Sequence, residues 1–284
     1  MNRASHRGRP PRWQAQPSPR RAARRPLTAL ATRAALALLI AALPATASAD
    51  PPPRRSGADF MSPALQALQR DDSRNPAQLW VAEGQALWSR PAANGRRCAD
   101  CQAPASLDRV ALRYPAFDDA LGRPLTLAGR IAQCRQRHQG EPADPRPDPD
   151  GPELLALTAW LASRARGQAI APVDDPRMAP WLARGGEVWR QRLGQLNLSC
   201  AQCHDERAGS RLGGAPIPQA HPTAYPIYRL EWQALGSLQR RLRGCLSGVR
   251  AEAFSDGADD WVALEAWLMR RAAGLLSEGA GVRP

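Results

Sequence analysis

The chain has 284 residues, enough for about two domains, and its 39 Lys and Arg against 26 Asp and Glu give a formal net charge of +13. Nine of the arginines lie within residues 1–49, which contain no acidic residue, so the remainder carries only +4. This modest charge gives no reason to expect nucleic-acid binding. No apolar run is long enough to span a bilayer.

Residues 1–49 have the pattern of a secretory signal peptide. An Arg-rich segment is followed by the apolar run 34–43 and then by Ala47-Ser48-Ala49, a small-residue cleavage signal. We expect cleavage after Ala49 and a mature periplasmic protein of 235 residues with no membrane attachment. Disulfides are stable in that compartment.

Residues 50–74 are expected to form an N-terminal lead-in before the folded part of the chain. Its first residues, 50–57 (DPPPRRSG), are rich in proline and are expected to be disordered. The sequence has a globular pattern from Asn75 onwards.

The globular part contains a hidden duplication. Residues 80–88 (WVAEGQALW) match residues 181–189 (WLARGGEVW), and each segment leads to a C-x-x-C motif. Three further features then recur with the same offset of 111 residues: Tyr114-Pro115 with Tyr225-Pro226, Arg130 with Arg241, and Cys134 with Cys245. So many matches in one order indicate two copies of one ancestral unit.

Each unit is predicted to contain a first helix, a C-x-x-C loop, a long irregular segment and a closing helix. The predicted closing helices carry apolar residues at helical spacing and share an Ala-Trp-Leu sequence, at 159–161 and at 266–268. We therefore predict a mostly α protein made of two tandem cytochrome c-like domains that arose by duplication.

The first domain is assigned to residues 75–170 and the second to residues 171–284, with the linker near 169–176. Residues 140–151 (GEPADPRPDPDG) form an acidic, Pro-rich insertion that is expected at the surface of the first domain.

The second unit contains Cys200-Ala201-Gln202-Cys203-His204, which fits the C-x-x-C-H signature of covalent haem c attachment. Two thiols at this spacing can each form a thioether to the porphyrin, and the adjacent His204 can ligate the iron. The alternatives for five residues alone are a redox C-x-x-C or half of a zinc site. The helix–loop–helix outline favours one covalently bound haem c, held by Cys200 and Cys203.

In the first unit, the equivalent C-x-x-C is followed by Gln102 rather than His, so we predict that this unit has lost its haem. Cys98, Cys101 and Cys134 are then left in an oxidising compartment. A disulfide Cys98–Cys134 is favoured, with Cys101–Cys134 as the alternative. Either would close a loop of roughly 35 residues and add about 3–4 kcal/mol on the chain-entropy model.

The second axial ligand of the haem iron is expected to come from the second unit. No Met lies between His204 and the closing helix, which leaves Cys245 and His221 as candidates. Cys245 follows a run of arginines, which would stabilise a thiolate, and Arg241 is four residues earlier on the same helical face: the neighbouring arginines are Arg240, Arg241 and Arg243. Cys245 is therefore the favoured ligand, and His221 is the second candidate or a hydrogen-bonding residue of the pocket wall.

These residues, together with the run from Cys200 to Glu252 that contains PIPQAHPTAYPIYRLEWQALGSLQRRLRGC, resemble the SoxA family of c-type cytochromes. The resemblance implies L-cysteine S-thiosulfotransferase activity, in which thiosulfate is oxidatively joined to a cysteine of a SoxYZ carrier and electrons leave through haem. It implies a heterodimer with SoxX, a monohaem cytochrome. It also implies that Cys245 is the distal iron ligand, as thiolate or persulfide, and that Arg241 binds the substrate. Gln102 departs from the two-haem members, so the chain resembles a one-haem member.

The main alternative from the sequence is a periplasmic electron carrier whose cysteine-ligated haem has a low potential. It differs from the transferase in that it needs no thiosulfate and no carrier.

Overall fold

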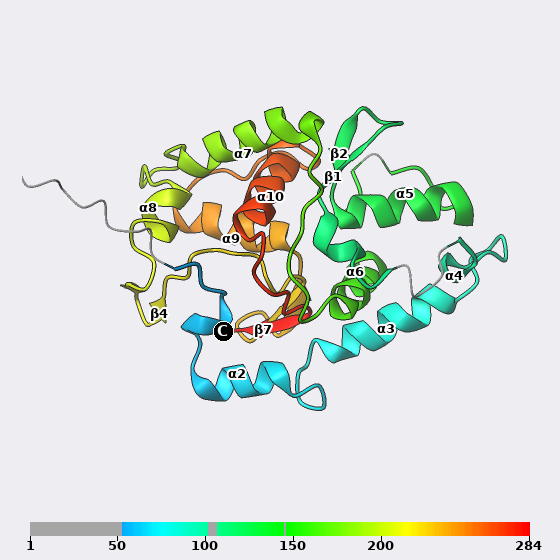
Figure 1. Cartoon of the computed structure of the whole chain (residues 1–284), viewed down its shortest axis with the longest axis horizontal. Coiled ribbons are helices and arrows are strands. Elements are labelled where there is room, and N and C mark those ends of the chain that lie inside the picture. Colours follow the sequence, from blue (N-terminus) through cyan, green and yellow to red (C-terminus); the bar gives the residue numbers. More distant parts are fainter. Residues whose placement is uncertain (1–52, 102–106, 145) are drawn as a thin grey trace, which may run out of the picture. The chain divides into compact units, whose positions relative to one another are not determined.

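The computed structural model describes residues 53–101, 107–144 and 146–284. The predicted signal peptide and its cleavage site lie outside the described residues. In the described part, each half of the chain is built on a pair of packed helices, as predicted (Figure 1). These pairs are α3 (Gln78–Ser89) with α6 (Pro152–Arg164), and α7 (Ala179–Arg190) with α10 (Asp259–Arg271).

A glycine at the same position of each pair allows the two helices to approach closely. A Cβ atom at Gly84 would lie 2.1 Å from the Ala156 carbonyl oxygen, and one at Gly185 would lie 2.1 Å from that of Ala263. The same steric requirement in both halves supports the duplication.

Between its two long helices, each half repeats the same minor elements. The C-x-x-C motifs lie on α4 (Cys98–Cys101) and α8 (Cys200–His204). A hairpin then leads into a helix whose N-cap is Thr126 in one half and Ser237 in the other. These elements are β1 (Ala116–Asp118), β2 (Arg123–Leu125) and α5 (Leu127–Gln139), then β5 (Ile227–Arg229), β6 (Ala234–Gly236) and α9 (Leu238–Gly248).

The hairpins occupy the segments that were expected to be irregular. Their strands have three residues each, too few to give an alternating pattern in the sequence. The remaining elements are the 3₁₀ helices η1 (Ala58–Phe60), η3 (Val110–Arg113) and η4 (Pro176–Met178), the pair β3 (Arg211–Leu212) and β4 (Ala215–Pro216), helix α2 (Pro63–Arg70) and strand β7 (Gly281–Arg283). No helix among residues 53–101, 107–144 and 146–284 has both the length and the apolar content to cross a membrane.

The lead-in is more ordered than expected. Arg54 donates to the carbonyl oxygens of Arg271 and Ala273, at 3.2 and 2.6 Å. Helix α2 packs on β7, which pairs in parallel with β5. The expectation of disorder is therefore wrong for residues 54–57, because tertiary hydrogen bonds hold a segment whose composition has no regular pattern.

The acidic insertion also has a structural contact beyond its own domain. Asp150 accepts hydrogen bonds from the backbone N–H and the hydroxyl of Ser237, at 2.7 and 3.0 Å. A carboxylate at a helix N-terminus is favourable, so the insertion of the first half stabilises the start of α9 in the second.

Candidate functional site

The C-x-x-C-H motif lies on a short helix whose start is set by a capping box. Ser199 Oγ accepts from the Gln202 N–H at 3.2 Å, and Gln202 Oε1 accepts from the Ser199 N–H at 2.9 Å. The helix therefore begins at Cys200, and Cys203 lies one turn later. The capping box thus sets the positions of both cysteines of the predicted haem attachment site.

His204 is oriented by the backbone. Its Nδ1 lies 2.6 Å from the Pro218 carbonyl oxygen, and a carbonyl can only accept, so Nδ1 carries the proton. The lone pair is then on Nε2, the nitrogen left for a metal. Burial lowers the pKa of His204, which favours the neutral, iron-binding form.

The His204 ring is also held from the side. The Trp189 ring lies 5.8 Å from it between centroids, and Trp189 Nε1 donates to Asp205 Oδ2 at 2.7 Å. Arg271 donates to the other oxygen of Asp205 at 2.6 Å and lies over the Trp189 ring. Side chains of α7 and α10 thus hold the C-terminal end of α8.

Cys245 and Arg241 lie in the same site as the motif. Burial, followed by the presence of Cys245, raises the pKa of the Cys200 thiol to about 11. Arg241, one turn before Cys245 on α9, contributes to the lowered pKa of His204. The predicted residues Cys200, His204, Arg241 and Cys245 are therefore brought together, although more than 40 residues separate Cys200 from Cys245.

The other two arginines of α9 have different partners. Arg243 pairs with Asp256 at 3.0 Å and lies over the Trp261 ring, and Arg240 lies over the Trp232 ring at 4.4 Å. Arg241 has no carboxylate partner within the described part of the chain. Of the three, Arg241 is thus the guanidinium that remains available for an anion beside Cys245.

His221 is buried, and its Nδ1 donates to the Arg55 carbonyl oxygen, which lies 2.8 Å away and can only accept. Burial lowers its pKa. Its neighbour Gln219 binds the Arg55 N–H at 2.6 Å, so the two residues hold the lead-in against this domain. This agrees with the expected role as a hydrogen-bonding residue of the wall.

The apolar surroundings of the motif fit a flat hydrophobic cofactor. Four positions of the first half are between 5 and 8% exposed, whereas their duplicates in the second half are only partly buried. The pairs are Cys98 with Cys200, Leu127 with Leu238, Ile131 with Leu242, and Trp160 with Trp267. The first half closes its core with its own side chains, and the second half leaves the equivalent side chains available to a haem.

In the first half, Cys98 begins α4 and is buried, and Cys134 lies on α5, which packs against α4. The Cys101 side chain lies outside the described residues. The pairing Cys98–Cys134, and its alternative through Cys101, both stay predictions.

Arg229, at the end of β5, is a site residue that the sequence reasoning missed. Burial, followed by the Arg241 guanidinium, lowers the pKa of Arg229, while Glu231, Tyr225 and Cys245 act in the opposite direction. The sequence feature that could have identified Arg229 is the 111-residue offset, which makes it the equivalent of Asp118 in the first half.

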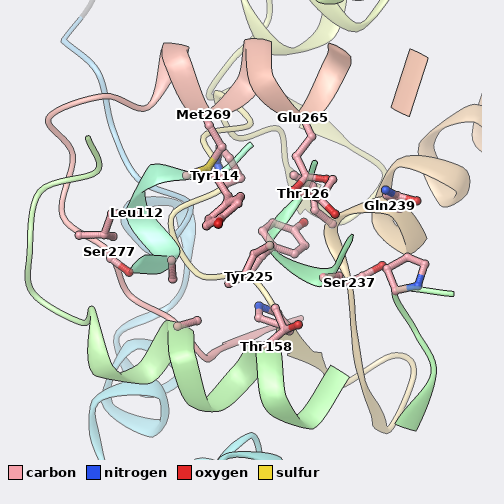
Figure 2. Close-up of a pocket in the computed structure, with 18 of the residues that line it drawn as sticks. Leu112, Tyr114, Thr126, Thr158, Tyr225, Ser237, Gln239, Glu265, Met269 and Ser277 are labelled. Carbon is pink, nitrogen blue, oxygen red and sulfur yellow. The ribbon is translucent and has the colours of Figure 1, made fainter. Parts of the chain in front are cut away.

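A cavity of about 100 Å³ lies between the two halves and next to this site (Figure 2). Its wall contains residues that the duplication relates: Tyr114 with Tyr225, Thr126 with Ser237, and Thr158 with Glu265. Figure 2 shows Glu265 and Met269 projecting from α10 on one side and Thr158 from α6 on the other. Burial raises the pKa of Tyr225 to about 12 and that of Glu265 to about 7.

Comparison with known proteins agrees with this arrangement. The model of the SoxA/TsdA cytochrome c domain matches residues 83–170 and 184–276, one segment in each half. The L-cysteine S-thiosulfotransferase subunit SoxA of Rhodovulum sulfidophilum is 34% identical over 81% of this chain and 80% of its own. That of Allochromatium vinosum is 34% identical over 73% and 74%.

A solved structure supports the same grouping. The crystal structure of SoxXA from P. pantotrophus superimposes with a TM-score of 0.76 at 30% identity, over 81% of this chain and 87% of that one. With the two helix pairs, the repeated C-x-x-C helices and these similarities taken together, the chain belongs to the SoxA family of c-type cytochromes.

Proposed function

We propose that the chain is the SoxA subunit of a periplasmic L-cysteine S-thiosulfotransferase that carries one haem c. Its relatives bear that name, and the similar solved structure is described as SoxXA. The partners proposed are a SoxX-type monohaem cytochrome, as a heterodimer, and a SoxYZ-type carrier protein that presents the acceptor cysteine.

In this proposal, Cys200 and Cys203 bind the haem covalently, His204 Nε2 is the proximal iron ligand and Cys245 is the distal one. Gln102 after the first C-x-x-C and the closed core of the first half support a single haem. When bound, haem c accepts electrons from the reaction and passes them on one at a time.

The reaction joins a carrier thiol to the thiosulfate dianion and gives an S-linked thiosulfonate, one proton and two electrons. Arg241 binds the anionic oxygens, because its guanidinium is unpaired within the described residues and carries several N–H donors. Cys245 lies one turn away. In this proposal it is a thiolate or persulfide that takes part in the sulfur transfer next to the bound anion.

The observation that carries this proposal is the position of Arg241, which has no carboxylate partner among the described residues, one turn from Cys245 and near Cys200 and His204. A plain electron carrier needs an axial ligand, but it needs no anion-binding cation next to that ligand. The transferase needs both.

The test is a reconstituted reaction that contains the mature holoprotein, a SoxX-type cytochrome, a SoxYZ-type carrier and thiosulfate. We expect thiosulfate-dependent reduction of haem and a carrier mass that increases by one thiosulfate. Haem that is reduced and reoxidised normally while the carrier mass stays unchanged would instead identify an electron carrier.

Cys245→Met separates haem binding from sulfur chemistry. Met can ligate haem iron, so we expect the haem to stay attached and the carrier modification to be lost. Undiminished turnover in this variant would exclude a sulfur-handling role for Cys245. The intact mass of the mature protein reports the haem count and the cleavage after Ala49 in one measurement.

A further inference from the structure

The duplication allows the anion site to be compared with its own counterpart in the first half. Strand β1 ends at Asp118 and β5 ends at Arg229, while Arg130 and Arg241 are the fourth residues of α5 and α9. Both pairs differ by 111 residues. Positions 118 and 229, and positions 130 and 241, are therefore structurally equivalent.

In the first half, these two positions form an ion pair whose carboxylate is buried. Asp118 Oδ2 lies 2.8 Å from Arg130 Nη2, and the Asp118 side chain is only 5% exposed. Burial by itself would raise the pKa of Asp118, but the Leu121 N–H and Arg130 outweigh it and hold the pKa below its usual value.

In the second half, the carboxylate has been replaced by a second guanidinium. The Arg229 side chain is 13% exposed, and its Nε is buried with no hydrogen-bond partner among the described residues. Two like charges thus stand at the positions where the other half places opposite charges, and the Arg241 guanidinium lowers the pKa of Arg229. Such an arrangement is costly unless an anion lies between them.

The negative groups near Arg229 and Arg241 do not neutralise both guanidinium charges. Glu231 pairs with Arg229, but its side chain is 66% exposed, so water screens the interaction. The Cys245 thiolate is the proposed ligand of the iron. One face of Arg229 lies over the Trp232 ring at 5.2 Å, which fixes the guanidinium plane.

We propose that Arg229 and Arg241 form a two-arginine clamp that binds a doubly charged sulfur oxyanion beside Cys245, an inference that rests on the proposed function. Two guanidinium forks match the two charges and the several oxygens of such an anion. The oxygens accept from the N–H groups of the clamp, so the sulfur end of thiosulfate is left for Cys245. Arg229 is thus a substrate-binding residue that the C-x-x-C-H motif does not indicate.

The experiment measures thiosulfate binding to the purified holoprotein by calorimetry, with sulfate as a second probe. Arg229→Gln should raise the thiosulfate Kd by about tenfold or more, because charge-assisted hydrogen bonds are lost. Arg229→Lys should recover part of the affinity. Arg243→Gln is the matched control, since it removes the same charge from α9 at a residue paired with Asp256; its Kd should stay at the wild-type value.

Arg229→Asp is the sharper variant, because it recreates in the second half the Asp118–Arg130 pair of the first. We expect it to abolish binding of both anions and, in anion-free buffer, to unfold at a higher temperature than the wild type. An unchanged thiosulfate Kd in Arg229→Gln, or a lower unfolding temperature for Arg229→Asp with binding intact, would overturn the clamp.

Sulfate distinguishes the possible ligands. Competition by sulfate that also depends on Arg229 would support a clamp for oxyanion dianions in general, whereas no competition would support a clamp specific for thiosulfate. The outcome is separable from the proposed function. If thiosulfate binding depends on Arg229 but the carrier is not modified, the clamp is supported and the transferase function is contradicted. If the carrier is modified but the thiosulfate Kd does not depend on Arg229, the transferase function is supported and the clamp is contradicted.

Discussion

Gly185 on α7 lies so close to Ala263 on α10 that a Cβ atom at position 185 would be 2.1 Å from the Ala263 carbonyl oxygen. The helix pair that supports the candidate haem site depends on this contact. Gly185→Ala must push the helices apart, so we expect it to lower the free energy of unfolding by at least about 2 kcal/mol.

Gly186→Ala is the matched control for this substitution. The atoms nearest to its added methyl group would be side-chain atoms of Arg190 and Trp267, at 3.3 and 3.4 Å, and not backbone atoms. Because Ala favours helix more than Gly, this variant should be neutral or slightly stabilised. Urea unfolding of both variants checks the prediction, and equal stability of the two would refute the close crossing.

Asp205 links Trp189 to Arg271 next to the proposed iron ligand. Its negative charge favours the oxidised, more positive iron, so we expect Asp205→Asn to keep the haem and to raise the midpoint potential. Glu206→Gln removes the same charge from the next residue, which is not part of the Trp189–Asp205–Arg271 hydrogen bonds, and should shift the potential less. Redox titration of the Soret band measures both, and a shift of equal size in the two variants would argue against a role for the Asp205 contacts.

The predicted disulfide of the first half is tested by peptide mapping of the non-reduced mature protein. We expect a linked peptide that contains Cys98 and Cys134, because α4 and α5 are packed together. Cys134→Ser should remove the link and lower the free energy of unfolding by about 3 kcal/mol. A peptide that instead joins Cys101 to Cys134 would select the alternative, and Cys245→Met, in the other half, should leave the link unchanged.

Glu265 makes stability depend on pH. Burial raises its pKa from 4.5 to about 7, so the folded state holds a proton that the unfolded state has released between these values. The stabilisation is complete below pH 4.5 and is lost as the pH rises through about 7. The loss is no more than about 3 kcal/mol.

Glu265→Gln should abolish this contribution while it keeps a hydrogen-bonding group next to Gln239. The measurement compares urea unfolding of the wild type and the variant at several values of pH on both sides of neutrality. Other titrating groups are common to both proteins and cancel in the difference. A difference that does not change with pH would show that Glu265 ionises normally in the cavity.

Features that depend on local patterns could be predicted from the order of the amino acids. The apolar spacing of residues 80–88 and 181–189 predicted the helices that the structure contains as α3 and α7. The C-x-x-C-H motif and the constant offset of 111 residues predicted the duplicated cytochrome c-like fold, and family comparison confirms it. Helical periodicity and repeat spacing depend only on the order of residues along the chain, so they can be recognised without the folded structure.

The partners of the charged side chains, in contrast, depend on how the elements pack and could not be predicted from local patterns. The sequence does not distinguish Arg240, Arg241 and Arg243 from one another. In the structure, Arg240 lies over the Trp232 ring, and Arg243 pairs with Asp256 and lies over the Trp261 ring. Arg229, on a three-residue strand with no periodic signal, lies close enough to Arg241 for that charge to lower its pKa. Long-range contacts depend on how whole elements pack, and a pair of like charges that folding brings near each other has no signature in local composition.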